Sequence, residues 1–88
     1  MRHLIYQMRR DTVTEDGLIL YAAPDKMELE TTIDGVPTTL ATNTNATSSV
    51  NQWYNVRAIF DGEHVEVWRG APGQTMTFVF STEGISGT

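Results

Sequence analysis

Short apolar segments alternate with polar turns along the whole chain, and no segment shows a helical period. Residues 4–10 begin with a period-two alternation and residues 26–33 alternate again, so both are predicted to be strands with one buried face. Residues 17–23 are almost continuously apolar, too short for a helix, and bounded by glycine and proline, which predicts a strand buried on both faces. The polar residues 11–16 are expected to connect the first two strands.

An Asp-Gly pair marks the first hairpin turn. Asp34-Gly35 directly follows residues 26–33, and both residue types tolerate the positive φ of a type I′ turn. Residues 36–42 are therefore predicted to return antiparallel. Because Pro37 cannot donate a hydrogen bond to a ladder, the return strand is expected to lie at a sheet edge or to begin after Pro37.

The second half of the chain repeats this turn chemistry. Asp61-Gly62 is expected to join strands at residues 52–60 and 64–69 in a second hairpin. Composition predicts the remaining segments: a polar surface loop at residues 43–51, a turn at 70–74, an alternating strand at 75–81 and a frayed tail at 82–88. About seven short strands in a single domain of residues 1–88 predict an all-β fold, an antiparallel β-sandwich or meander.

The alternation also predicts which side chains are buried. In the strand at residues 52–60, every second side chain is expected in one buried row: Tyr54, Val56, Ala58 and Phe60. A similar apolar row in the last strand is expected in the core rather than at a ligand site: Met76, Phe78 and Phe80.

Composition and charge exclude several classes of partner. The 88 residues include no cysteine, so no disulfide or thiolate metal site supports the small core. The net charge is −5. Arg2, Arg9 and Arg10 supply three of the six basic residues, and the rest of the chain has three basic residues against eleven acidic ones, a balance that argues against nucleic acid as a partner. No apolar run approaches the roughly 20 residues that span a membrane, and we find no secretory signal. The compartment stays open between the cytoplasm and a longer secreted protein.

Three segments, in this order, resemble the signature of one sandwich family. They are Asp-Gly-Leu-Ile-Leu-Tyr at residues 16–21, the alternating strand and turn at 27–35, and Trp-Tyr-Asn-Val at 53–56, followed by Val65 and Val67. Over roughly residues 3–70 the chain is similar to the laminin-G-like branch of the concanavalin-A-like lectin and glucanase sandwiches. The resemblance implies a short relative of their jelly roll, with Trp53 in the core and with loops that bind glycans or proteins.

Neither the carboxylates nor the histidines form a catalytic or metal-binding pattern. Glu28 and Glu30 lie at i and i+2 of one strand, about 7 Å apart, but lack the Glu-x-Asp-x-x-Glu motif of glycosidases with the resembling fold. His3 and His64 have no cysteine partners and no triad order. The aspartates that could bind calcium lie in turns, which favour Asp for backbone reasons: Asp25, Asp34 and Asp61. We therefore expect no catalytic residue, no metal site and no cofactor, and not an enzyme.

Trp68 is the strongest candidate for ligand contact. It shares the polar face of its strand with His64 and Glu66, opposite two valines. A tryptophan flanked by Glu66 and Arg69 could stack on a sugar ring or anchor a protein contact, or it could pack under a loop or a second sheet. The candidate ligand-binding residues are His64, Glu66, Trp68 and Arg69.

Two functions follow from these observations. One is a non-catalytic binding module of laminin-G-like character that contacts carbohydrate or protein through turn loops. The other is a self-associating structural subunit that completes its sandwich as a homodimer, because the resembling sandwiches are longer than this chain and sheet edges need cover. The strands at residues 4–10 and 75–81 are the candidate edges, with these interface residues: Tyr6, Arg9, Met76, Phe78 and Phe80.

Overall fold

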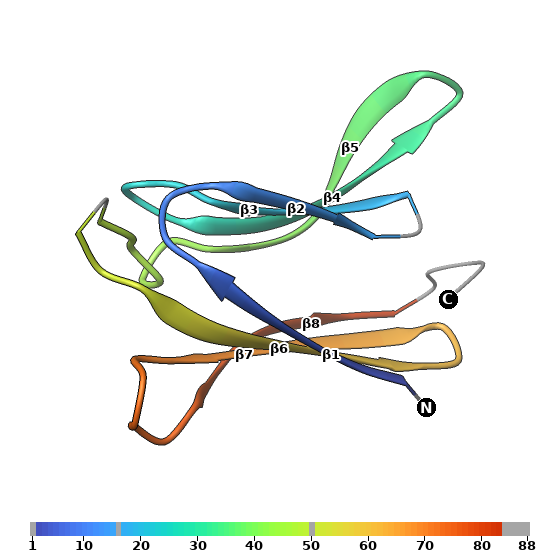
Figure 1. The fold of residues 1–88 in the computed structure, drawn as a ribbon. Helices are drawn as coiled ribbons and strands as arrows, with labels where there is room; N and C mark the ends of the chain where they lie inside the picture. Colours follow the sequence, from blue (N-terminus) through green and yellow to red (C-terminus); the bar gives the residue numbers. More distant parts are fainter. Residues whose placement is uncertain (1, 16, 50, 84–88) are drawn as a thin grey trace.

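Two antiparallel sheets of four strands each lie face to face in a computed structural model that describes residues 2–15, 17–49 and 51–83 (Figure 1). The prediction of an all-β antiparallel sandwich is confirmed. The described residues form eight strands, against about seven expected: β1 (Arg2–Met8), β2 (Thr12–Glu15), β3 (Leu18–Ala22), β4 (Met27–Ile33), β5 (Val36–Asn43), β6 (Tyr54–Asp61), β7 (His64–Gly70) and β8 (Thr77–Thr82).

The first layer, called sheet A, has the strand order β1-β6-β7-β8 and forms the lower layer in Figure 1. The chain therefore begins in sheet A, crosses to the other layer, and returns to pair β6 with β1. The strands expected as edges, at residues 4–10 and 75–81, are the two edges of this sheet. Thr82, expected in a frayed tail, belongs to β8 and pairs with Val65 of β7, whereas residues 84–88 lie outside the described residues.

The second layer, called sheet B, is a meander in the order β2-β3-β4-β5. Its edge strand β2 corrects the expectation that residues 11–16 form only a connection. Val13 pairs with Leu20 of β3 and packs against the core, while Thr12 and Thr14 face solvent. An edge strand with one apolar side chain has too little hydrophobic alternation to be recognised, although Thr and Val favour extended backbone.

Burial of β3 on both faces was also a wrong prediction. Leu18, Leu20 and Ala22 point into the sandwich, but Tyr21 is 39% exposed. The reason is that the described residues place no third layer over the outer face of sheet B, and an antiparallel sheet tolerates water on one face.

The β4–β5 hairpin confirms the predicted turn chemistry. Asp34 and Gly35 have φ values of 51° and 81°, the positive pair that a type I′ turn requires. The strand that contains Pro37 is the edge of sheet B, as predicted. A register shift between Leu29 and Glu30 interrupts the β4–β5 ladder, and Figure 1 shows the tip of the hairpin extending beyond the other strands.

The core lies between the inner rows of the two sheets. The predicted row on β6 is confirmed, because Val56, Ala58 and Phe60 are buried and Tyr54 is half-buried against them. Trp53, expected in the core from the family resemblance, is instead 45% exposed. It precedes β6 in the chain, and the Arg9 guanidinium lies 4.6 Å from the centre of its ring.

A β-bulge in the β7–β8 ladder corrects the row predicted for the last strand. Val67 pairs with Phe80 but Trp68 pairs with Phe78, so Val79 is an extra residue. Val79 and Phe80 are consecutive and are both 6% exposed, whereas Phe78 is 50% exposed. The bulge thus ends the simple alternation and turns Phe78 outward.

The two phenylalanines of β8 provide a matched test of this packing. Phe80→Ala should destabilise the fold by about 3–5 kcal/mol, because it leaves a cavity between the sheets. Phe78→Ala should cost only about 1 kcal/mol, since it removes a half-exposed ring and one aromatic edge contact. Urea unfolding followed by tryptophan fluorescence measures both, with Phe80→Leu as a milder variant. Equal losses, or a loss that depends on protein concentration, would contradict burial of Phe80 within one chain.

Candidate functional site

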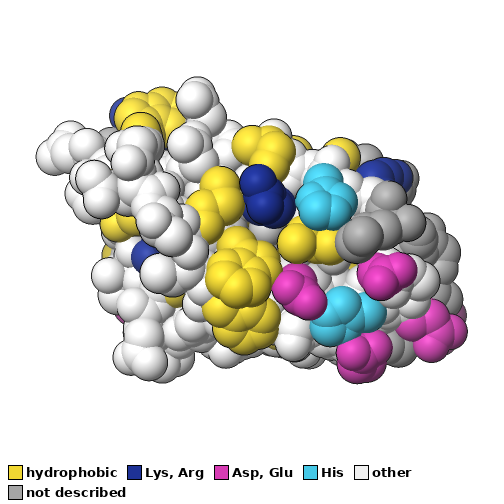
Figure 2. Space-filling view, turned by 90° about the horizontal axis from the view of Figure 1, so that it is seen from below, with side chains coloured by type: hydrophobic (Ala, Val, Ile, Leu, Met, Phe, Trp, Pro, Cys, Tyr) yellow, Lys and Arg dark blue, Asp and Glu magenta, His cyan; other side chains and the backbone are white. Residues whose placement is uncertain are grey.

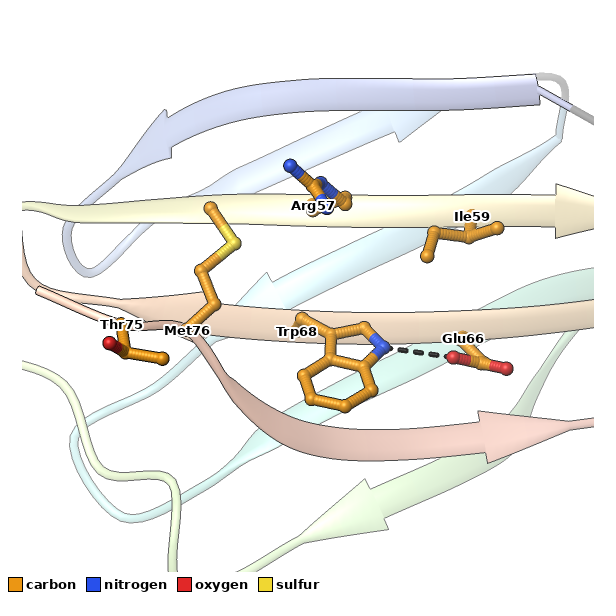
Figure 3. Close-up of a pocket in the computed structure, with 6 residues that line it drawn as sticks. All are labelled: Arg57, Ile59, Glu66, Trp68, Thr75 and Met76. Carbon is orange, nitrogen blue, oxygen red and sulfur yellow. Dashed lines mark hydrogen bonds between the residues drawn. The ribbon is translucent and has the colours of Figure 1, made fainter.

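An open pocket of about 480 Å³ lies on the outer face of sheet A, and we call it the Trp68 pocket (Figure 3). Side chains from β6, β7 and the loop before β8 line it: Arg57, Ile59, Glu66, Trp68, Thr75 and Met76. Figure 2 looks onto this face and shows hydrophobic side chains around a basic one, with acidic and histidine side chains gathered to one side. The face therefore combines apolar contact area with groups of both charges.

The strands place these side chains through simple alternation. Burial of the valines in β7 turns Glu66 and Trp68 outward, and burial of the inner row of β6 does the same for Arg57 and Ile59. The β6–β7 register then pairs Arg57 with Trp68 and Ile59 with Glu66. This register follows from the tight turn between the strands, where Asp61 pairs with His64 across a two-residue loop.

The turn itself differs in detail from the predicted pair. The loop residues are Gly62 and Glu63 rather than Asp61 and Gly62, because Asp61 still belongs to the ladder. Gly62 has a φ of 62°, while Glu63 has a negative φ. Glycine at the first central position is the arrangement of a type II′ turn.

Gly70 lets the loop before β8 approach β7 closely. A Cβ atom at this position would lie 3.0 Å from both Met76 Cα and Thr75 O, which is too close for an ordinary side chain. In Figure 3 the Met76 side chain extends from this loop toward β6, beside the indole of Trp68. Glycine at position 70 thus allows the loop to form one wall of the pocket.

Trp68 is the floor of the pocket. Figure 3 looks onto the sheet and shows the indole nearly face-on, so the ring lies over the strands with one face outward. Phe78 stands against it in an edge-on contact, with ring centres 5.4 Å apart and planes at 76°. The indole Nε1–H donates a 2.8 Å hydrogen bond to Glu66 Oε1, which fixes the ring in its plane.

The carboxylate that holds Trp68 is itself held by His64. His64 Nε2 lies 2.9 Å from Glu66 Oε2, and its Nδ1 lies 2.5 Å from Glu83 Oε1. The hydrogen bonds to Glu66 and then to Glu83 raise the pKa of His64, because they stabilise the imidazolium. The Trp68 N–H and then His64 lower the pKa of Glu66. The four side chains form one chain of contacts that ends at the indole.

Both ring nitrogens of His64 already have carboxylate partners. Among the described residues no group of three or more His, Cys, Asp or Glu side chains is placed to hold a metal ion. His64 has a carboxylate on each ring nitrogen, so neither nitrogen is left as a ligand. The contact of His64 with Glu66 orients the Glu66 carboxylate.

The structure brings together three of the four ligand candidates predicted from the sequence. His64, Glu66 and Trp68 share the outer face of β7, but Arg69 points to the opposite face and lies 4.0 Å from the centre of the Tyr54 ring. Sequence reasoning missed Arg57 and Ile59, which the β6–β7 register would have identified.

The five interface candidates occupy different environments. Tyr6 is half-buried against the core, Met76 lines the Trp68 pocket and Phe80 lies in the core. Arg9 lies over Trp53, and Phe78 is exposed beside Trp68. The five side chains therefore do not form one surface.

Comparisons with known proteins give no relative for this chain. No protein-family model, curated protein or solved structure matches it. The laminin-G-like resemblance therefore stays a prediction. No helix in the described part of the chain is long and apolar enough to cross a membrane.

The His64 network predicts a pH-dependent contribution to stability. His64 has a raised pKa, so its contribution is complete below its ordinary pKa of 6.5 and is lost as pH rises through the raised value. Glu66 acts in the opposite sense, and its contribution is lost as pH falls through its lowered pKa.

The measurement is the melting temperature of wild type and His64→Gln between about pH 4 and about pH 9. The wild type should gain most over the variant in mildly acidic solution and lose this advantage toward the alkaline end. Added salt should reduce the difference, since the groups are near the surface. A difference that stays constant with pH, or that grows in alkaline solution, would rule out the charged form of His64 as its source.

Proposed function

We propose that the chain is a non-catalytic binding module that takes a carbohydrate ring in the Trp68 pocket. The observation that carries the proposal is the flat indole with an outward face, held in place through Glu66 and His64 before any ligand arrives. A platform that is already ordered loses little conformational freedom on binding, so more of the contact energy appears as affinity.

The chemistry of the pocket suits a sugar better than a purely apolar ligand. One face of a pyranose carries C–H groups, which can cover the indole and displace water from it. The hydroxyl groups at the ring edge need donors and acceptors, and Arg57 and Glu66 supply both at the rim of the indole. Met76 adds an apolar wall, and Phe78 packs against the indole.

The family resemblance supports the same class of function, since laminin-G-like and lectin sandwiches bind glycans. The proposed position differs from the loop rim that the resemblance implies. Here the floor consists of strand residues of β6 and β7, and only Thr75 and Met76 come from a loop. Strand residues hold a site more rigidly than loop residues do, which favours a stacking platform.

Self-association remains the second candidate function. One chain already closes the core between its two sheets, so a partner is not needed to bury Phe80. The observation that favours association is the pair of exposed apolar side chains, Ile5 on β1 and Phe78 on β8, at the two edges of sheet A. Light scattering over a concentration series measures this: a stable dimer supports association, and a constant monomer mass removes it.

The test of the carbohydrate proposal begins with a glycan screen of the wild type, followed by calorimetric titration of the best ligand. Trp68→Ala should weaken binding by about 30-fold, or about 2 kcal/mol, as expected for a central aromatic contact. Trp53→Ala is the matched control, because it removes an exposed indole outside the pocket. The proposal fails if no glycan binds, or if the two variants weaken binding equally.

A further inference from the structure

A second, smaller pocket of about 190 Å³ lies beside the edge strand β8, and we call it the Arg69 pocket. Its polar side chains come from the end of β5, the loop after it, β7 and β8: Asn43, Asn45, Arg69 and Thr77. We infer that this pocket binds a carboxylate group through the guanidinium of Arg69.

The structure fixes the Arg69 side chain from two sides. Its guanidinium lies 4.0 Å from the centre of the Tyr54 ring, and Nη1 donates to Thr47 O at 3.0 Å and to Ser48 Oγ at 3.2 Å. Ser48 and Ala46, two positions before it, are buried, although residues 43–51 were predicted to be a surface loop. The loop therefore packs into the sandwich and holds Arg69 in a defined position.

The other nitrogens of the guanidinium are accessible to solvent, and Arg69 lines the pocket. Within the described part of the chain, both side-chain hydrogen bonds of Arg69 start at Nη1. The same residues include no fully buried side-chain nitrogen or oxygen without a partner, so Nε and Nη2 must be reachable by solvent. In arginine, the Nε–H and Nη2–H bonds point the same way, and this pair matches the two oxygens of a carboxylate.

Arg69 differs from Lys26 and His64 in its surroundings. Lys26 lies 2.9 Å from Glu28, and His64 lies between two carboxylates. In residues 2–15, 17–49 and 51–83, no ion pair involves Arg69, and its contacts are a ring and neutral groups. Burial lowers the pKa of Arg69, which reflects the cost of a partly dehydrated charge. An anion from outside would offset that cost.

The rim of the pocket is neutral and already organised. Asn43 donates from Nδ2 to Val79 O at 2.7 Å and accepts from the Asn45 backbone N–H at 2.8 Å, so its amide ties β5 to the edge of β8. Thr77 Oγ1 donates to Arg69 O. Among the residues that the structure describes, no acidic side chain lines the pocket. One cation with neutral neighbours matches a singly charged anion, and the net charge of −5 disfavours anions of higher charge.

A carboxylate could come from an acidic sugar or from a peptide, and matched ligands separate the two. Glucuronate is compared with glucose, and N-acetylglutamate with N-acetylglutamine, by titration of the ¹⁵N-labelled protein followed by NMR. The Arg69 Nε–H signal and the amide signals of Asn45 and Thr77 should shift with at least one acid and with neither neutral analogue. Shifts with glucuronate alone identify a sugar acid, and shifts with N-acetylglutamate alone identify a peptide acid.

The test variant is Asn45→Asp, which places a carboxylate at the rim without changing a buried side chain. Binding of the acid should become at least ten-fold weaker, because the new carboxylate repels the ligand and competes for Arg69. Asn51→Asp, outside the pocket, makes the same change in net charge and should leave the affinity unchanged.

Three results would overturn the inference: no shift with either acid, equal shifts with the neutral analogues, or equal effects of the two variants. The Trp68 Nε1–H signal reports separately on the Trp68 pocket. If glucose or glucuronate shifts this signal and neither acid shifts Arg69 Nε–H, the proposed function is supported and the carboxylate site is overturned. If an acid shifts Arg69 Nε–H and no sugar shifts Trp68 Nε1–H, the carboxylate site is supported and the proposed function is overturned.

Discussion

The pairing of Asp61 with His64 in the β6–β7 hairpin is the constraint on which the rest of the sheet A face depends. A shift of one residue in this ladder would move every side chain of one strand to the opposite face. The observed register puts Phe60 opposite Val65 inside the sandwich. The same register obliges Arg57 and Trp68 to meet outside it. The same strand register therefore determines both the burial of the core and the assembly of the pocket.

Much of the fold was predictable because apolar alternation and turn chemistry agree with each other. The Asp34-Gly35 turn and the inner row of β6 are cases in which local sequence alone determines the outcome. The errors occur where tertiary packing decides. Strand β2 has one inward apolar side chain, Trp53 lies just outside a strand, and Val79 belongs to a bulge that alternation cannot reveal.

The candidate site was partly predictable for the same reason. Period two places His64, Glu66 and Trp68 on one face, and the structure agrees. The same rule assigns Arg69 to the opposite face. The prediction that grouped Arg69 with Trp68 was wrong because residues adjacent in a strand point to opposite faces. To place Arg57 opposite Trp68, one must know the register of the β6–β7 hairpin. The Asp-Gly motif does not determine that register, because it does not show which two residues form the turn.

The bulge in β8 relates the two pockets to each other. Without the bulge, the period of two would place Phe78 and Phe80, on either side of Val79, on the same face. With it, Phe80 fills the core, while Phe78 contacts Trp68 and also lines the Arg69 pocket. A single ring thus contacts the indole of one pocket and lines the other pocket. Since β8 is an edge strand, the bulge costs the ladder little and gives this edge two chemically different surfaces.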